Sequence, residues 1–255
     1  MKYLNEYINI MKRYKQGEFG SENLSMYDIL NKANSSGLLD KLDLSEIQYL
    51  LDSSSGITKK MFSMLKQKKE NKIIVMKRLE KELCAYKIDF YRDEEDDSDD
   101  ALANNLKLKV LYCDDDSLDE DTEALLCPID DKDYLGKIKV KKDCVTTRFS
   151  FRHELIHYFR DVKVGNKVTK AVARKTKGKT PDDEEQEVNY LTAASIMPIE
   201  EMSAELVKFE EIVSRDVEEA FLSNLAEKYG QNEEAVLRRL IEVRCLNDYK
   251  GSLKE

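Results

Sequence analysis

The chain has 255 residues, of which 36% are charged and 41% hydrophobic, and its formal net charge at pH 7 is -9. The excess of acid argues against a protein whose whole surface binds nucleic acid phosphates, and no apolar run approaches the ~20 residues that span a membrane. Five scattered cysteines without a C-x-x-C pair indicate neither a disulfide framework nor a cysteine zinc site. We therefore expect a soluble, cytoplasmic protein with no membrane partner.

The first part of the chain is predicted to be helical. Residues 2–16 carry apolar side chains at helical spacing, and a short helix follows at 25–33. Ser45 is placed to cap a third helix, Thr58 begins a fourth, and residues 72–86 form a fifth. The third and fourth resemble a helix-turn-helix. We favour simple packing over DNA binding, because no base-reading side chains can be singled out.

The middle of the chain changes to strand patterns. Residues 106–110 and 136–142 alternate with period two, and 88–91 and 124–127 are further candidates. We therefore expect a small sheet. The strand at 136–142 places lysines on its second face, which is typical of a half-exposed or edge strand. Such an edge offers an extended peptide a place as an added strand, a hypothesis that a covered edge would remove.

Three runs of like charge surround these strands. Acidic residues gather at 93–100 and 114–121, and basic residues at 163–179. Because salt screens exposed charges strongly, we interpret all three as independent solvated loops rather than as a basic segment covered by acidic ones.

The most specific pattern is the pentapeptide HELIH at 153–157. Two histidines four residues apart lie on one face of a helix, and the Glu after the first can act as a general base. His153 and His157 are the only histidines in the chain. Zinc binds imidazole nitrogens in a tetrahedral set that leaves one position open. The sequence therefore predicts a Zn2+ site with His153 and His157 as ligands, Glu154 as the base, and Ser150 as the helix cap.

A third protein ligand has to come from outside this helix. With no further histidine available, a carboxylate is the expected ligand type. A helix that begins near Pro181 and ends at Pro198 supplies Glu184, Glu185 and Glu187. We favour Glu185, with Glu187 next, because Asn189 lies one turn after Glu185 and its amide can orient a ligating histidine.

The end of the chain is predicted to form two more helices. They cover 217–228 and 233–244, with Asn232 as the cap of the second. Their spacing is that of a helix-turn-helix with Arg238 and Arg239 facing outward. We favour a packing module over a DNA reader, because nearby acids weaken any phosphate-binding face.

Together these motifs resemble the ImmA/IrrE family of bacterial and phage metallopeptidases. Residues 149–157 are similar to the family pattern F-[ST]-x-A-H-E-x-G-H, and 185–198 to E-x-E-A-N-x-F-A-x-x-L-L-M-P. Residues 225–240 are similar to the helix-turn-helix extension of the family, and the resemblance covers about 70–246. Arg152 departs from the pattern, since the family has a small residue there, and so puts the shape of the cleft beside His153 in question.

The resemblance implies a fold and a function. The fold would be α+β and mainly helical, with a zincin-like metallopeptidase core at 71–200 that contains a small sheet. A helical region at 1–70 would precede it, and a helix-turn-helix-like extension at 201–255 would follow. The function would be site-specific cleavage of a protein substrate, typically a DNA-binding transcriptional repressor, by a zinc endopeptidase.

Two points stay open at this stage. Tyr158 and Tyr190 are both candidates to hold the oxyanion, and spacing does not choose between them. The same motifs also fit a non-catalytic zinc-containing regulator that binds a partner protein or DNA, or one component of a toxin-antitoxin pair.

Overall fold

The computed structural model describes residues 2–15, 38–86, 99–114, 118–119, 122–142, 147–163, 165–175 and 183–252. Within these ranges, every helix is too short or too polar to pass through a lipid bilayer. The predicted helix at 25–33, the predicted strand at 88–91 and most of the first acidic run lie outside the described residues.

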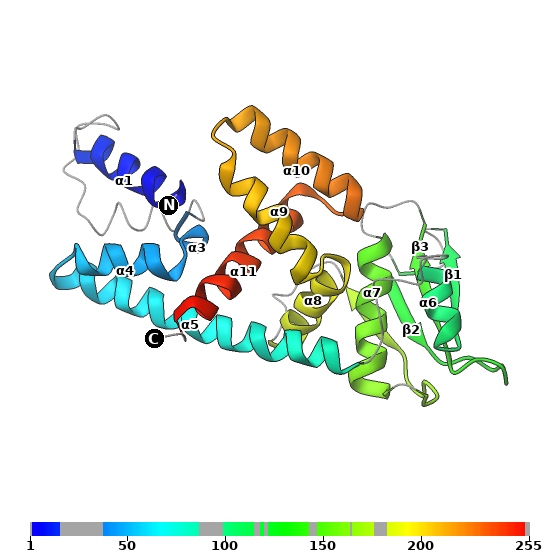
Figure 1. Cartoon of the computed structure of the whole chain (residues 1–255). Coiled ribbons are helices and arrows are strands. Elements are labelled where there is room, and N and C mark those ends of the chain that lie inside the picture. The colour runs from blue at the N-terminus through cyan, green and yellow to red at the C-terminus, as the bar shows by residue number, and fades with distance from the viewer. Residues whose placement is uncertain are drawn as a thin grey trace. The chain divides into compact units, whose positions relative to one another are not determined.

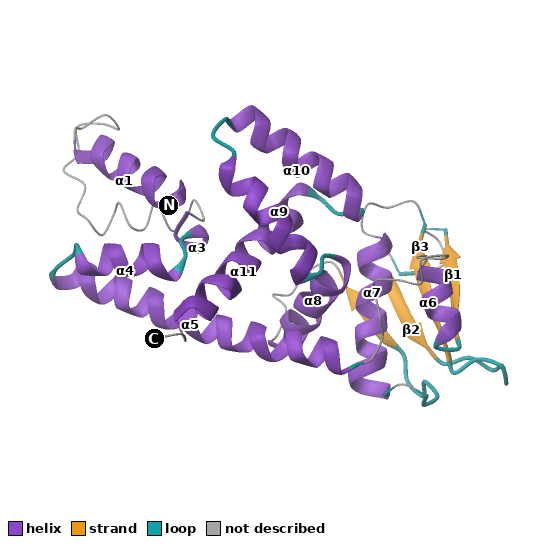
Figure 2. Cartoon of the chain, viewed as in Figure 1, coloured by secondary structure: helices purple, strands orange, loops and turns teal. Residues whose placement is uncertain are grey.

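The described residues form helices and one sheet (Figures 1 and 2). The helices are α1 (Lys2–Lys15), α3 (Leu38–Lys41), α4 (Leu44–Asp52), α5 (Gly56–Ala85), α6 (Asp99–Asn105), α7 (Thr147–His157), a π-helical turn η2 (Tyr158–Val162), α8 (Asp183–Ile196), α9 (Ile199–Glu211), α10 (Arg215–Tyr229) and α11 (Glu233–Ser252). The strands are β1 (Leu108–Cys113), β2 (Thr122–Cys127), β3 (Gly136–Lys141) and β4 (Val172–Lys175). The predicted α+β, mainly helical fold class is confirmed.

The chain divides into two compact units that draw on separate stretches of sequence. The first comprises Met1–Lys77, Leu206–Glu211 and Leu240–Glu255, and the second comprises Arg78–Glu205 and Ile212–Arg239. Because this division follows contacts rather than chain order, the three-part division at residues 70 and 200 stays a prediction.

The first unit has a core built from α1, α3, α4 and the beginning of α5. Its buried members are Tyr3, Leu4, Tyr7, Leu39, Leu42, Ile47, Leu50 and Phe62. The α4 helix is capped by Asp43 rather than by Ser45: the Asp43 carboxylate accepts the Glu46 N–H, and the Glu46 carboxylate accepts the Asp43 N–H. Two backbone donors are satisfied in this way, as in a capping box.

The α5 helix is a single element of 30 residues, where the sequence pattern predicted two helices. The polar stretch at 66–72 that separated the two predictions contains neither glycine nor proline. It consists mainly of lysine, glutamine and glutamate, which favour the helical state almost as strongly as leucine. The loss of apolar periodicity there marks a change of environment, not a break in the helix.

The sheet of the second unit has the strand order β1-β3-β2-β4. β3 pairs in parallel with β1 and antiparallel with β2, and β2 pairs antiparallel with β4. Residues 136–142 form a half-exposed strand, one of the two expectations, but not an edge strand, so the proposed peptide-binding edge at that strand was wrong. Its lysines lie on a half-buried face of an internal strand. The edges are β1 and β4, and β4 was not predicted because it lies within the basic run.

The α7 helix packs on this sheet against β2 and β3 (Figure 1). Apolar side chains of both layers are fully buried: Ala124, Leu126, Ile138, Val140, Phe151, Leu155 and Ile156. Close packing extends to Gly136, where an added Cβ would lie 2.4 Å from Val168 Cγ2. The helix begins at Thr147, so Ser150 is not its cap, and the Ser150 hydroxyl instead donates to Glu123 Oε2 at 2.8 Å. This packing fixes the orientation of the HELIH motif.

Candidate metal centre

The side chains of the two histidines of HELIH project from the same face of α7, one helical turn apart. Their ring centroids are 4.9 Å apart and their planes meet at 66°. The side chains of His153 and His157 are 1% and 12% exposed. Because α7 packs against α8, the rings face the carboxylates at the beginning of that helix.

Glu185 of α8 completes a cluster with the two rings. Its Oε1 lies 3.2 Å from His153 Nε2, and its Oε2 lies 3.4 Å from His157 Nε2. One ligand atom from each of the three residues falls within 4.8 Å of the others. The Glu185 side chain is 31% exposed, so the cluster reaches solvent on that side.

The other two acids considered for this role are placed differently. Glu187 accepts a hydrogen bond from Arg160 Nη2 at 2.9 Å and is paired with Arg78. Glu184 is exposed on α8, outside the cluster of possible ligands. Of these acids, Glu185 therefore lies beside the two histidine rings, and Glu187 is paired with Arg78 and Arg160.

Hydrogen bonds and charge hold the carboxylate and the two rings together. Burial acts to lower the pKa of His157, but hydrogen bonds to Glu185 and Asp161, together with the charge of Glu154, raise it from 6.5 to about 9. Hydrogen bonds from His153 and His157 hold the pKa of Glu185 far below its usual range. Each ring thus attracts the Glu185 carboxylate, and this attraction draws the three groups together.

The sequence reasoning missed Asp161. Its Oδ2 lies 2.8 Å from His157 Nδ1, on the side of the ring away from Glu185. Asp161 belongs to the π-helical turn η2, which follows α7 directly. The available signal was the spacing of four residues between His157 and Asp161, which places both on one helix face.

Glu154 is fully buried beside the histidines. Its Oε2 accepts the Leu126 backbone N–H of β2 at 3.0 Å, which directs the carboxyl group toward the sheet side of α7. The carboxylate is close enough to His157 to contribute to the raised pKa of that ring. Glu154 is therefore a buried acid group beside the cluster, fixed by a backbone donor.

Asn189 and the two tyrosines lie near these helices but have other surroundings. Asn189 is half-buried on α8, and within the described ranges its side chain makes no hydrogen bond to either histidine. The Tyr158 hydroxyl donates to Asn166 O and accepts the Gly165 N–H. The Tyr190 hydroxyl donates to Glu80 at 2.6 Å. Each tyrosine hydroxyl is thus used in holding the fold, and the oxyanion role stays unassigned.

Arg152, the departure beside the first histidine, does not fill a cleft. Its side chain is 1% exposed, and its Nε donates to Asp99 Oδ1 at 2.7 Å. Asp99 is the first residue of α6, so this pair joins α6 to the metal-bearing helix. An arginine is accommodated here because a carboxylate neutralises it on the face of α7 away from the cluster.

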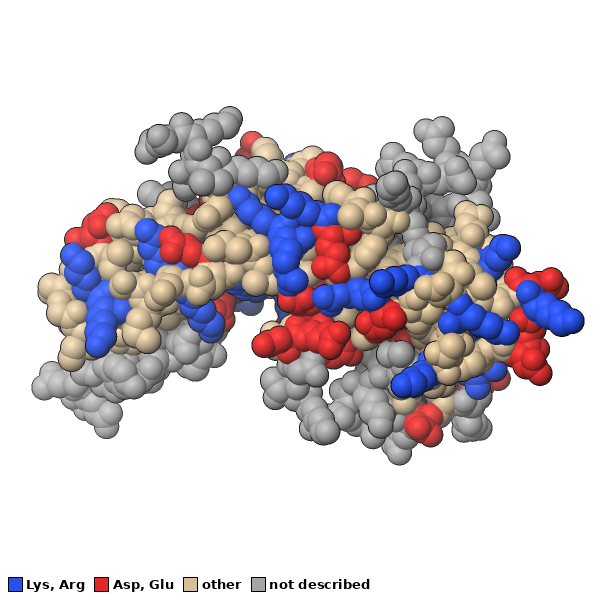
Figure 3. All heavy atoms as spheres, turned by 90° about the horizontal axis from the view of Figure 1, so that it is seen from below, with Lys and Arg blue, Asp and Glu red and all other residues tan. Residues whose placement is uncertain are grey.

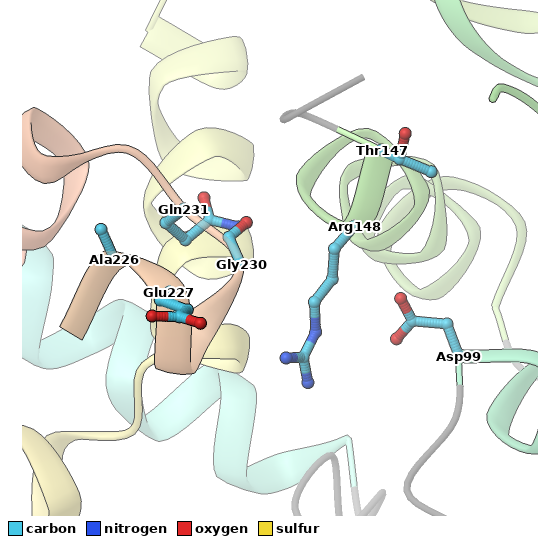
Figure 4. Close-up of a pocket in the computed structure, with 7 residues that line it drawn as sticks. All are labelled: Asp99, Thr147, Arg148, Ala226, Glu227, Gly230 and Gln231. Atoms are coloured by element: carbon cyan, nitrogen blue, oxygen red, sulfur yellow. The ribbon is translucent and has the colours of Figure 1, made fainter. Parts of the chain in front are cut away.

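A cavity of about 480 Å3 lies between the beginning of α7 and the end of α10 (Figure 4). Arg148 extends into it from α7, and Glu227 and Gly230 line the opposite side. At about 100° per residue, Arg148 and His153 lie roughly 140° apart around the α7 axis. The cavity therefore opens on a different side of the helix from the metal cluster, and we assign it no role in the chemistry.

The C-terminal helix pair offers little to a phosphate backbone. The expectation that Arg239 faces outward was wrong: its side chain is fully buried and donates to Met197 O and to Glu80. Arg238 is exposed but paired with Glu234 at 3.0 Å. On the face opposite to α10, Figure 3 shows acidic and basic side chains interleaved rather than segregated. Whether the helix pair binds DNA is not tested by these contacts, and the packing module stays the prediction.

Residues 138–241 match the family model Peptidase_M78, described as the IrrE N-terminal-like domain. The matched range contains α7 and α8 and therefore every residue of the cluster. No curated protein and no solved structure matches the chain. The match confirms the family resemblance inferred from the motifs, and it implies that this segment is a peptidase domain.

Proposed function

We propose that this chain, with an IrrE N-terminal-like domain at residues 138–241, is a zinc endopeptidase that cleaves a regulatory protein. The observation that carries the proposal is the convergence of His153, His157 and Glu185 beside the buried Glu154. Family membership alone would fit an inactive relative. A full set of ligands with an acid group next to it favours an active one.

The donor set fits zinc. Two imidazoles and one carboxylate with an open fourth position form the ligand set of many catalytic zinc sites. Ligand atoms that lie about 2.0 to 2.1 Å from a tetrahedral ion are roughly 3.3 Å apart, close to the 3.2 and 3.4 Å between Glu185 and the two rings. When bound, zinc would lower the pKa of a water molecule to about 7 and polarise a carbonyl group.

Glu154 is the proposed general base. A carboxylate in this position takes a proton from the attacking water and returns it to the leaving amine of the peptide. Its Oε2 is held by the Leu126 N–H, so the group has a fixed orientation during both transfers. Asn189 is proposed to support a ligating histidine once the site is loaded, as its place one turn after Glu185 suggests.

The proposed substrate is a DNA-binding transcriptional repressor in the cytoplasm. This part of the proposal is supported by the family resemblance, whose members typically act on such repressors. A partly buried cluster, in which Glu185 is 31% and His157 12% exposed, is also better suited to one extended segment of a protein than to general digestion.

The test compares wild type with Glu154→Gln in cells that co-express a candidate helix-turn-helix repressor. Glutamine keeps an oxygen that can accept the Leu126 N–H, so the fold and zinc content should be retained. Removal of a general base should lower the rate of cleavage by about 100-fold to 10,000-fold. Repressor length on immunoblots and zinc content by metal analysis are the measurements.

Glu184→Gln is the matched control, because it removes an exposed acid from α8 without touching the cluster. It should cleave like wild type. If wild type binds both zinc and the repressor but leaves it intact, the chain is a zinc-containing regulator and the enzyme proposal fails.

A further inference from the structure

We propose that Asp161 is a positioning residue: it holds His157 in the tautomer and orientation that bind the metal, and so sets how tightly the metal is retained. This inference rests on the proposed zinc site and concerns a residue that lies outside the ligand set. It follows from the contacts of Asp161 and from the turn that carries it.

The two nitrogens of the His157 ring face different carboxylates. Nε2 faces Glu185 Oε2 at 3.4 Å, and Nδ1 faces Asp161 Oδ2 at 2.8 Å. A neutral imidazole carries its proton on one nitrogen and offers the lone pair of the other. An acceptor at Nδ1 therefore keeps the proton there and leaves Nε2 to bind an ion, the arrangement found around most metal-binding histidines.

The position of Asp161 is built into the chain by the π-helical turn. This turn ends at Lys163, which has φ +67° and whose N–H donates to Tyr158 O. The Tyr158 hydroxyl accepts the Gly165 N–H and donates to Asn166 O, and Asn166 Nδ2 donates to Val162 O at 3.0 Å. These bonds tie the turn to the loop behind it, so Asp161 is held beside the ring.

Arg160, the residue before Asp161, forms its ion pairs with other acids. Arg160 pairs with Glu82 at 3.1 Å and with Glu187 at 2.9 Å. Within the described ranges, the His157 ring is the hydrogen-bonding and ion-pairing partner found for the Asp161 side chain. Asp161 is therefore directed to the ring, even though its side chain is 40% exposed.

The experiment measures zinc affinity in the full chain by competition with a chromophoric chelator. Loss of an acceptor behind a ligating histidine typically weakens metal binding 10-fold to 100-fold. Asp161→Ala should fall in this range. Asp161→Asn should lose less, because its amide oxygen still accepts a hydrogen bond from Nδ1 but carries no charge. Glu184→Gln removes a nearby exposed acid and should bind zinc like wild type.

Because the chain has two histidines, NMR of the imidazole rings gives a second measurement. In zinc-loaded wild type, the His157 ring should show its N–H at Nδ1 in slow exchange with water. In Asp161→Ala the Nδ1 proton of His157 should exchange faster with water, while the chemical shifts of the His153 ring stay unchanged. A general loss of stability would change both rings and would not separate them.

Three outcomes decide the inference. Weaker zinc binding in Asp161→Ala, with partial recovery in Asp161→Asn and none of the loss in Glu184→Gln, supports it. Wild-type affinity in Asp161→Ala, or in Asp161→Leu should the alanine variant not fold, overturns it and leaves the proposed function intact, because neither side chain can accept a hydrogen bond from Nδ1. Absence of zinc from wild type itself removes both proposals.

Discussion

In the first unit, acidic side chains surround one arginine; in the second, two histidines surround one glutamate. Arg244 lies with Asp43, Glu46 and Glu210, at distances of 2.5, 3.4 and 3.1 Å. The Arg244 side chain is 11% exposed, about as buried as His157. Arg244 and His157 therefore both have little access to water, but the two clusters differ in the source of their positive charge.

The arginine cluster contains its own cation. A guanidinium group stays charged at every pH that a protein tolerates, so the acids around Arg244 are compensated whenever the unit is folded. The histidine cluster obtains positive charge only by binding protons or a metal ion. The comparison shows why one group is suited to holding a fold together and the other to binding a ligand.

The largest effect is expected where the fixed cation is removed. Arg244→Met leaves three acids in the first unit without their partner, and breaking a buried ion pair from one side costs about 3 to 5 kcal/mol. Urea unfolding should show this loss of stability. The double variant Arg244→Met with Glu210→Gln should regain part of it. An unchanged free energy of unfolding in Arg244→Met would show that the cluster is not structural.

The second largest effect concerns the histidine cluster of the second unit and its proposed third ligand, Glu185. Glu185→Gln removes a charged ligand, so zinc affinity should fall by at least about 100-fold, or about 3 kcal/mol, beyond the usual effect of an outer partner. Glu187→Gln should retain zinc, because its carboxylate pairs with Arg78 and Arg160. Chelator competition measures both. If Glu187→Gln loses zinc and Glu185→Gln keeps it, the assignment of the third ligand is reversed.

The metal cluster was more predictable than the arginine cluster for a physical reason. His153 and His157 follow from helical periodicity, which acts over four residues, and the choice of Glu185 follows from ligand chemistry. Arg244 meets Asp43 across some 200 positions, and its place on α11 gives no sign of the partner. Local patterns carry information about one face of one helix, while ion pairs between distant segments depend on packing.

The failures of the sequence reasoning have the same origin. Arg239 was assigned to solvent because it is charged, but Glu80 of α5 supplies a buried partner. The alternating lysines of β3 indicated a half-exposed or edge strand, and the strand is half-exposed but internal, because β1 pairs with its other side. In each case the local pattern described the side chains correctly, and the tertiary neighbours decided their environment.

The smallest effect concerns the pH dependence of the first unit. Burial and the nearby charge of Asp43 raise the pKa of Asp248 to about 6, against the opposing charge of Arg244, with Glu210 and Glu46 adding to the rise. The folded state therefore binds this proton more tightly than the unfolded chain does. Its contribution to stability is fully present below pH ~4 and is lost as the pH rises through about 6.

Asp248→Asn removes this titration by keeping a neutral group in place at every pH. The variant should be more stable than wild type at pH 8, by roughly 1 kcal/mol once partial exposure is allowed for, and should match it near pH 4. Urea unfolding at pH 8, 6 and 4 measures the difference, with the exposed Glu211→Gln as a control that should show no such trend. A gain that is equal at all three pH values would mean that folding does not raise the pKa of Asp248, and a loss at pH 8 would mean that Arg244 holds Asp248 in its charged form. In the second case Arg244 would have a further charged acid beside it, and the contrast with the histidine cluster, which gains positive charge only by binding protons or a metal ion, would be sharper.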